Sequence, residues 1–166
     1  MFFYELHEGD NEVYSDVLVV SESEVETLLT MGECIEVMER ALASLARGEF
    51  FQPLRSVIRP PGVQGFLGLM PAASASHFAL KEVCIFPGNP VRGLDTHLVA
   101  VLLHSGETGE LLAVMNASAI TAIRTAAVSA VATKLLARED AKNLAIIGPG
   151  VQARRHLEAI PLVRKI

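Results

Sequence analysis

The chain has 166 residues, a formal net charge of −5 at pH 7, and a hydrophobic share of 51%. This length fits one domain, or one domain and part of a second, with enough apolar residues for a sizeable core. The acidic balance argues against nucleic acid or an anionic membrane as a partner, and the lack of a signal-peptide pattern or a long apolar run leads us to expect a cytoplasmic protein.

The first part of the chain predicts short strands and a helix. Val17–Val20 is β-rich, and Met1–Tyr4 is apolar and could add an edge strand. Ser23 and Glu26 have the spacing of a capping box, in which a hydroxyl and a carboxylate satisfy the first N–H groups of a helix. We therefore expect a helix that begins near Ser23 and ends near Gly32.

A second helix and a sheet are expected next. Apolar residues recur at helical spacing from Ile35 to Leu45, and Gly48 provides a stop. From Leu54 to Met115 the spacing changes to short β segments separated by turn residues, with Ser105–Gly109 as a hairpin loop. The expected strands are Leu54–Arg59, Gly65–Met70, Ala79–Phe86, His97–His104 and Glu110–Met115. This pattern predicts an α+β arrangement, with an antiparallel or mixed sheet that carries the N-terminal helices on one face.

The last third of the chain predicts the start of a nucleotide-binding domain. Thr121 should cap a long alanine-rich helix that ends near Leu136. The stretch from Leu144 to Ala153 then has the pattern of a buried strand, a glycine turn and a helix start, as in the first unit of an α/β Rossmann domain. Gly148 would allow the turn, and Gly150 would let the backbone approach a pyrophosphate held by the free N–H groups of the helix.

Three cations are candidates for chemistry. Lys81 shares a strand face with two apolar residues, so burial could lower its pKa and prepare it for proton transfer; the alternative is a sheet-edge lysine that reaches water. Arg55, or Arg59 at the same strand parity, could clamp a carboxylate with its guanidinium fork, although each alone also fits a surface arginine. Arg124 is expected in the first turn of the Thr121 helix.

An anion site is the functional interpretation of Arg124, because the helix start adds free N–H groups and Thr125 could donate a further hydrogen bond. The alternative is an ion pair with Glu107 or Glu110. The scattered histidines and the distant cysteines do not form a metal-binding set, so we expect no metal.

Several separate motifs together resemble the ornithine cyclodeaminase and mu-crystallin family from about Val17 onward. The motifs are Gln52-Pro53-Leu54-Arg55, Gly65-Phe66-Leu67-Gly68-Leu69-Met70-Pro71, Lys81 before Phe86-Pro87-Gly88-Asn89-Pro90, Thr121-Ala122-Ile123-Arg124-Thr125-Ala126-Ala127, and Gly148-Pro149-Gly150-Val151-Gln152-Ala153. The resemblance implies a homodimer with a substrate and dimerisation domain, here residues 1–125, followed by a Rossmann domain, of which residues 126–166 would form the linking helix and first unit.

The resemblance also implies site residues and a reaction. Arg55, Lys81 and Arg124 would hold the substrate carboxylate, with Lys81 also catalytic at the reacting amine or imine. An NAD or NADP cofactor would contact Thr96, Arg124, Thr125 and the turn residues Gly148, Gly150, Val151 and Gln152. The implied reaction moves a hydride to or from the α-carbon of an amino or imino acid, as in a ketimine reductase, an amino-acid dehydrogenase or a cyclodeaminase.

Two departures restrict what the resemblance implies. Family members that act on ornithine have a glutamate at the position of Gly68, whereas glycine is the pattern of mu-crystallin and of alanine or ketimine reductases. The aspartate that the cyclodeaminases place in the later half of their Rossmann domain has no counterpart here. The acidic residue that would bind the ribose, about 20 residues past the glycines, would also fall beyond Ile166. We therefore expect this chain alone to be inactive, and the alternative function is a non-catalytic ligand-binding or dimerisation module.

Overall fold

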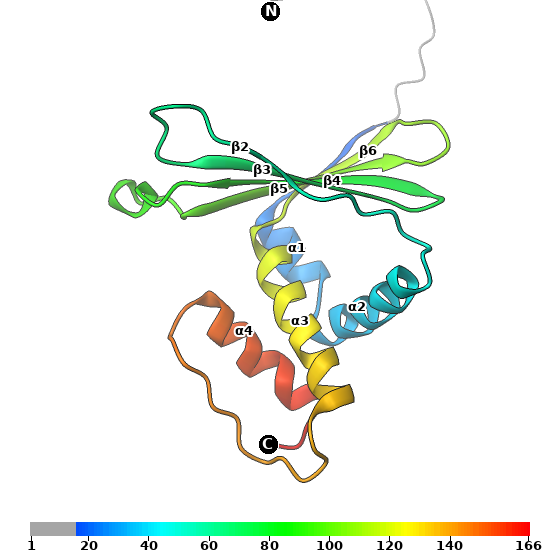
Figure 1. Ribbon diagram of the computed structural model, residues 1–166, viewed down its shortest axis with the longest axis vertical. Coiled ribbons are helices and arrows are strands. Elements are labelled where there is room, and N and C mark those ends of the chain that lie inside the picture. The colour runs from blue at the N-terminus through cyan, green and yellow to red at the C-terminus, as the bar shows by residue number, and fades with distance from the viewer. Residues whose placement is uncertain (1–15) are drawn as a thin grey trace, which may run out of the picture.

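The computed structural model describes residues 16–166 (Figure 1), so the strand expected at Met1–Tyr4 lies outside the described residues. The strands are β1 (Leu18–Val20), β2 (Ser56–Ile58), β3 (Phe66–Ala73), β4 (His77–Ile85), β5 (His97–Ser105) and β6 (Leu111–Asn116). The helices are α1 (Glu22–Leu28), α2 (Met31–Ala46), α3 (Ser118–Leu136) and α4 (Val151–Ala159), with 3-10 turns η1 (Asn89–Arg92) and η2 (Ile160–Leu162).

The first two helices begin at capping boxes, but the predicted box was wrong by two residues. Ser21 caps α1, and Glu24 supplies the returning carboxylate. Glu26 of the predicted box points elsewhere and pairs with Arg155. The break between α1 and α2 falls before Thr30, which caps α2 together with Glu33. Gly32 therefore lies inside α2 and does not end a helix, contrary to the prediction from the sequence. Both misplacements arise because this segment contains several hydroxyl and carboxylate pairs at the same spacing.

The strands form one mixed sheet, as predicted. Its order is β1-β6-β5-β4-β3-β2, with β1 parallel to β6 and the other pairs antiparallel. The hairpin between β5 and β6 is confirmed, with the Ser105 N–H donating to the Glu110 carbonyl at 2.9 Å. The first expected strand is shorter than predicted, since only Ser56–Ile58 pairs and Arg55 lies just before it.

All the helices lie on one side of the sheet, and α3 runs through the middle of them (Figure 1). Its buried face is made of small residues: Ala126, Ala127 and Ala130 are fully buried, beside Ile123 and Val131. The same cluster contains Cys34 and Ile35 of α2 and Ala159 and Ile160 at the end of α4. Alanine allows the helix axes to approach closely, so α3 is the common support of α2 and α4.

The long helix begins four residues earlier than predicted, since its N-cap is Ala117 and not Thr121. Asn116 Oδ1 accepts the Ser118 N–H at 3.1 Å, and this contact starts α3 at Ser118. The Thr121 hydroxyl is inside the helix and donates to the Ala117 carbonyl, a local bond that serine and threonine often make in helices. Arg124 therefore lies in the second turn of α3, and the prediction that it stands in the first turn was wrong.

The predicted buried strand of the nucleotide-binding unit does not form. Residues 144–147 have no strand partner among the described residues, and Ile147 is fully exposed. An apolar run becomes a strand only when neighbouring strands accept its backbone hydrogen bonds. The following glycine turn and α4 do form, with Gly148 at φ 103° and Pro161 just after the end of α4.

Among residues 16–166, α3 alone is long and apolar enough by composition to cross a membrane, which the sequence did not lead us to expect. Core helices of soluble proteins meet the same criterion. The buried alanine face of α3 contacts α2 and α4 in this structure.

The tight packing of α3 predicts that enlarging a side chain destabilises the fold on its buried face and not on its exposed face. Ala127→Leu should lower the free energy of unfolding by about 1–3 kcal/mol, because the larger side chain has no space in the buried cluster. Urea unfolding followed by circular dichroism measures this change. Ala132→Leu, at an exposed position of the same helix, is the matched control and should change stability by less than about 0.5 kcal/mol. Equal effects of the two variants would contradict the packing described.

Candidate functional site

The structure brings together the three cations that the sequence singled out. Lys81 is in β4, a central strand between β3 and β5, so it is not the sheet-edge lysine of the alternative interpretation. Burial, and then the positive charges of Arg124 and Arg55, together lower the pKa of Lys81 to about 8. These two charges act on the same ammonium, which places a residue from α3 and one from the segment before β2 around it.

Arg124 is partly buried in this cluster, and no carboxylate in residues 16–166 forms an ion pair with it. The alternative interpretation, a pair with Glu107 or Glu110, is therefore not observed. The charge of Arg124 also reaches Cys34, where burial raises the thiol pKa and Arg124 partly offsets the rise. Within the described part of the chain none of the three cations has a paired carboxylate. Such a cluster attracts an anion, and a carboxylate fits the fork of an arginine.

The other candidate cation has a structural role. The Arg59 guanidinium lies over the Phe66 ring, 5.0 Å from its centroid. This cation–π contact ties the end of β2 to the start of β3. Of the two arginines left open by the sequence, Arg55 is the one beside Lys81.

Gly68 lies on the same face of the sheet as Lys81. Its register partner in β4 is Val83, two residues from Lys81. A Cβ atom at Gly68 would lie 3.1 Å from Val83 Cγ1, so a side chain there requires a small shift of Val83. Glycine thus leaves this part of the sheet face free, next to the cation cluster.

A cavity of about 480 Å³ lies between α1, the segment before β5, the start of α3 and the start of α4. Three of the expected cofactor residues line it: Thr96, Val151 and Gln152. Thr121 also lines it and lies one turn before Arg124, on the same side of α3. The cavity and the cation cluster are therefore neighbours along α3.

The remaining expected cofactor residues lie outside this cavity. Gly148 and Gly150 line a second depression of about 530 Å³ between α3, the 144–147 segment and α4, and Gln152 borders both. Arg124 lines neither. The Thr125 hydroxyl donates to the Thr121 carbonyl at 2.6 Å in this structure, and its contact with an anion stays a prediction.

The amino end of α4 has the chemistry of a phosphate site. Gly150 is the N-cap and makes no side-chain cap hydrogen bond. The N–H groups of Val151, Gln152 and Ala153 therefore lack a capping partner within the helix and point outward at its positive end. This arrangement fits the pyrophosphate of a dinucleotide.

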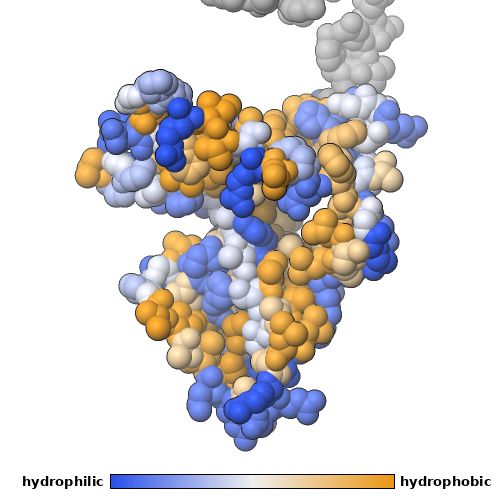
Figure 2. Space-filling view, in the orientation of Figure 1, coloured by the Kyte–Doolittle hydropathy of each residue, from blue (hydrophilic) through white to orange (hydrophobic). Residues whose placement is uncertain are grey.

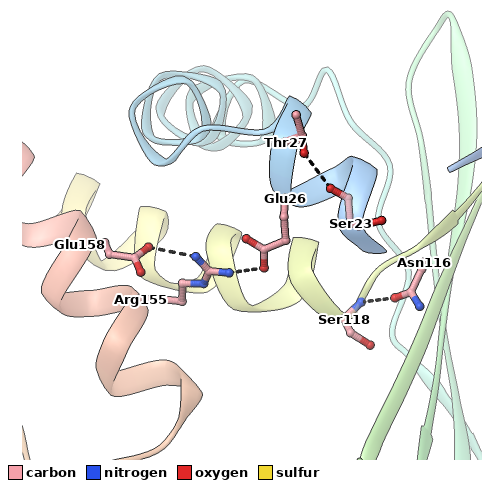
Figure 3. Close-up of polar contacts among 7 residues, drawn as sticks. All are labelled: Ser23, Glu26, Thr27, Asn116, Ser118, Arg155 and Glu158. Carbon is pink, nitrogen blue, oxygen red and sulfur yellow. Dashed lines mark hydrogen bonds and ion pairs between the residues drawn. The ribbon is translucent and has the colours of Figure 1, made fainter. Parts of the chain in front are cut away.

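Sequence reasoning missed the ion pairs at this cavity (Figure 3). Arg155 of α4 pairs with Glu26 of α1 and, at 3.0 Å, with Glu158 of its own helix. Glu22, Glu26 and Arg155 all line the cavity. In the sequence, Glu26 stood out only as a member of the predicted capping box, and that pattern indicated helix capping and not an ion pair with Arg155.

Comparisons with known proteins agree on one family. Residues 15–166 match the sequence model of the ornithine cyclodeaminase/mu-crystallin family. The ketimine reductase mu-crystallin of Mus musculus is 45% identical over 129 residues, which are 75% of this chain and 41% of that protein.

Two solved structures have the same fold. The Thermococcus litoralis Delta(1)-pyrroline-2-carboxylate reductase, in complex with NADH and L-proline, has a TM-score of 0.84 and 43% identity over 89% of this chain and 46% of its own. An archaeal alanine dehydrogenase dimer with bound NAD has a TM-score of 0.84 and 37% identity over 89% of this chain and 45% of its own.

The chain thus spans less than half the length of each of these proteins. The comparisons confirm the predicted fold class, a mixed sheet with helices followed by the start of a Rossmann-like unit. With nearly its whole length matched, the chain belongs to the ornithine cyclodeaminase/mu-crystallin family.

Proposed function

We propose that this chain supplies the substrate site and the first nucleotide-binding unit of an NAD(P)-dependent enzyme that moves a hydride to or from the α-carbon of an amino or imino acid. The observation that carries the proposal is the cluster of Arg55, Lys81 and Arg124, beside the cavity at the start of α3 and α4, with which no carboxylate of residues 16–166 forms an ion pair. The division into residues 1–125 and 126–166 belongs to this proposal, and its border lies inside the continuous helix α3.

The cluster has the groups that such a reaction needs. The guanidinium groups of Arg55 and Arg124 would hold the carboxylate, which fixes the α-carbon beside Lys81. A pKa of about 8 keeps the Lys81 ammonium mostly protonated at pH 7 and still able to give up a proton. In the direction of imine reduction, Lys81 would donate that proton to the imine nitrogen.

The cofactor would lie along the cavity, with its pyrophosphate at the amino end of α4. Thr96, Val151 and Gln152 are the expected contacts that line the cavity, and Gly148 and Gly150 give the turn that frees the α4 amides. Arg124 would face the phosphates from α3. When bound, the nicotinamide accepts or donates the hydride.

Gly68 directs the proposal toward the reductases and dehydrogenases of the family. Gly68 places no side chain on the sheet face beside Val83, so a second amino group on the substrate would lack a carboxylate partner at that position. A small cyclic imine or a 2-oxo acid with an amine suits this surface. Ornithine suits it less well.

The second candidate function is a carboxylate-binding or dimerisation module without redox activity. It uses the same cation cluster and is favoured by the unpaired segment 144–147, which leaves the nucleotide unit without a sheet of its own in the described residues. Nucleotide binding separates the two candidates.

The cation cluster predicts a pH-dependent binding of amino-acid carboxylates. Lys81→Met should weaken the binding of L-proline by at least about tenfold, since a charge-assisted hydrogen bond is lost. Wild-type affinity should fall as the pH rises above about 8, because the Lys81 ammonium loses its charge there. Bound carboxylate raises the pKa of Lys81, so the fall begins near pH 8 and ends at the higher pKa of the complex. Isothermal titration calorimetry from pH 6 to 10 measures both effects.

Lys134→Met removes a lysine that pairs with Glu39 on α2 and is the matched control. It should leave the affinity and its pH profile unchanged. Equal affinity in the wild type and in Lys81→Met at pH 7 would exclude Lys81 from the carboxylate site.

The amino end of α4 predicts a second, separable effect. Gly150→Asp places a carboxylate at the N-cap, where the surroundings are open and φ is −73°. The new side chain should cap α4 and keep the fold stable, but occupy the amides that bind the pyrophosphate. The dissociation constant of NADH, measured by fluorescence titration, should therefore rise at least about tenfold.

Gly32→Asp makes the same charge change at an open position in the first turn of α2 and should not alter NADH binding. Saturable binding of NADH or NADPH to the wild-type chain would support the redox proposal. Its absence in the folded chain would favour the non-catalytic module.

The sheet also supports a homodimer. Leu80 and Leu102 face each other across β4 and β5, and Val114 continues this row on β6. These residues alternate with Lys81, Val101 and Ala113, which are on the helix side, so the row lies on the other face. Among the described residues no helix covers that face (Figure 1), and apolar surface is exposed on the sheet layer (Figure 2).

A second copy of the chain is the proposed occupant of this face, because an open apolar sheet in solution associates with a like surface. The wild-type chain should sediment at twice its 17.8 kDa. Leu102→Glu, at the centre of the row, should give the monomer mass in analytical ultracentrifugation, whereas Val91→Glu in the exposed turn η1 should not. A wild-type monomer at micromolar concentration would contradict this assembly.

A further inference from the structure

Arg155 links two helices that are far apart in the sequence. One terminal nitrogen of its guanidinium donates to Glu26 on α1, and the other donates to Glu158 on α4 (Figure 3). Only 21% of its side chain is exposed, compared with 40% for Glu26. Burial lowers the pKa of Arg155, but its hydrogen bonds to Glu26 and Glu158 outweigh this effect and raise the pKa above its ordinary value.

The pair forms part of the wall of the proposed nucleotide cavity. Glu26 and Arg155 both line it, together with Val151 and Gln152 at the amino end of α4. Arg155 lies four residues, about one turn, after Val151, so the two side chains are on the same side of α4. The pair therefore connects the phosphate-binding end of α4 directly to α1.

Charge gives the pair a second consequence. The cavity is lined by three carboxylates, those of Glu22, Glu26 and Asp95. Among its described lining residues, Arg155 is the one with a guanidinium or ammonium group. An unpaired Glu26 would repel an anionic pyrophosphate across the cavity. With Arg155 in place, the carboxylate of Glu26 is neutralised and oriented toward α4.

We propose that Arg155 is a positioning residue for the nucleotide: by pairing with Glu26, it fixes the amino end of α4 against α1 and keeps the cavity open to a pyrophosphate. The inference rests on the proposed function, since it names what sets the affinity of that site. Arg155 acts through Glu26 and α4, without contacting the phosphates itself. The neighbouring helix α3 buries the far end of α4 at Ala159 and Ile160, while the pair sets the position of the turns before it.

Two measurements on the full chain test this proposal. The first is hydrogen exchange of the amides in α4, compared with those in α2. The second is the dissociation constant of NADH. Arg155→Gln and Glu26→Gln should each speed exchange at the start of α4 and leave α2 unchanged. Arg155→Gln should weaken NADH binding about three- to fivefold, the range for a partly exposed ion pair, and Glu26→Gln should weaken it less, because only Arg155→Gln leaves an unpaired carboxylate at the cavity.

The double variant Glu26→Gln/Arg155→Gln should bind NADH no more weakly than the single variant with the larger loss, because both substitutions remove the same interaction. Arg155→Lys keeps the charge and should retain NADH binding within about twofold. Glu158→Gln removes the partner of Arg155 on its own helix and leaves the link to α1, so this control should match the wild type in both measurements.

Additive effects of the two single substitutions on NADH binding would overturn the proposal, since they would show that Arg155 contacts the nucleotide independently of Glu26. Unchanged exchange at the start of α4 in both single variants would overturn it as well. If the wild-type chain binds no nucleotide, the proposed redox function fails and the positioning of the nucleotide falls with it. The exchange data would then still show separately whether the pair fixes α4.

Discussion

The close packing of α3 is the constraint on which the other parts of this structure depend. Ala126, Ala127 and Ala130 have no exposed surface, and α2 and the end of α4 meet at this alanine face. The small side chains let α2 and α4 pack closely against α3. The single helix α3 therefore positions both the helices next to the sheet and the nucleotide-binding unit. Arg124 and Thr121 extend from the same helix toward the cation cluster and the cavity.

The cation cluster shows how a sheet and a helix can prepare a binding site. Strand alternation turns Lys81 toward the helices, and α3 brings Arg124 close enough for its charge to lower the pKa of that lysine. Holding like charges together in a half-buried place costs stability. The cost is offset when a carboxylate binds, and this is the electrostatic reason to regard the cluster as a ligand site.

Helix α4 is joined to the rest of the chain by polar contacts near the cavity and by apolar contacts at its far end. Ile160 and Ala159 bury the end of α4 against α3, while Arg155 reaches Glu26 beside the cavity. A second polar link lies between them, where His156 Nε2 and the Ser129 hydroxyl are 2.8 Å apart. An apolar contact holds the far end of α4, and the polar contacts hold the turns nearer its amino end.

The sequence by itself determined the β segments between residues 54 and 115, the helices on either side of them, the family motifs and the residue types of the site, because hydrophobic spacing, glycine turns and motif residues are local properties. It left open whether the sheet is antiparallel or mixed. It did not determine which of several equivalent hydroxyl and carboxylate pairs caps α1, nor that α3 begins at Ser118, since each choice depends on competing local hydrogen bonds. It could not show that the apolar run at 144–147 stays unpaired, because a strand requires partners outside its own segment. Only the tertiary structure brought Lys81, Arg55 and Arg124 together and joined Glu26 to Arg155 across 129 positions of sequence, because such contacts depend on how helices pack and not on the spacing of residues along the chain.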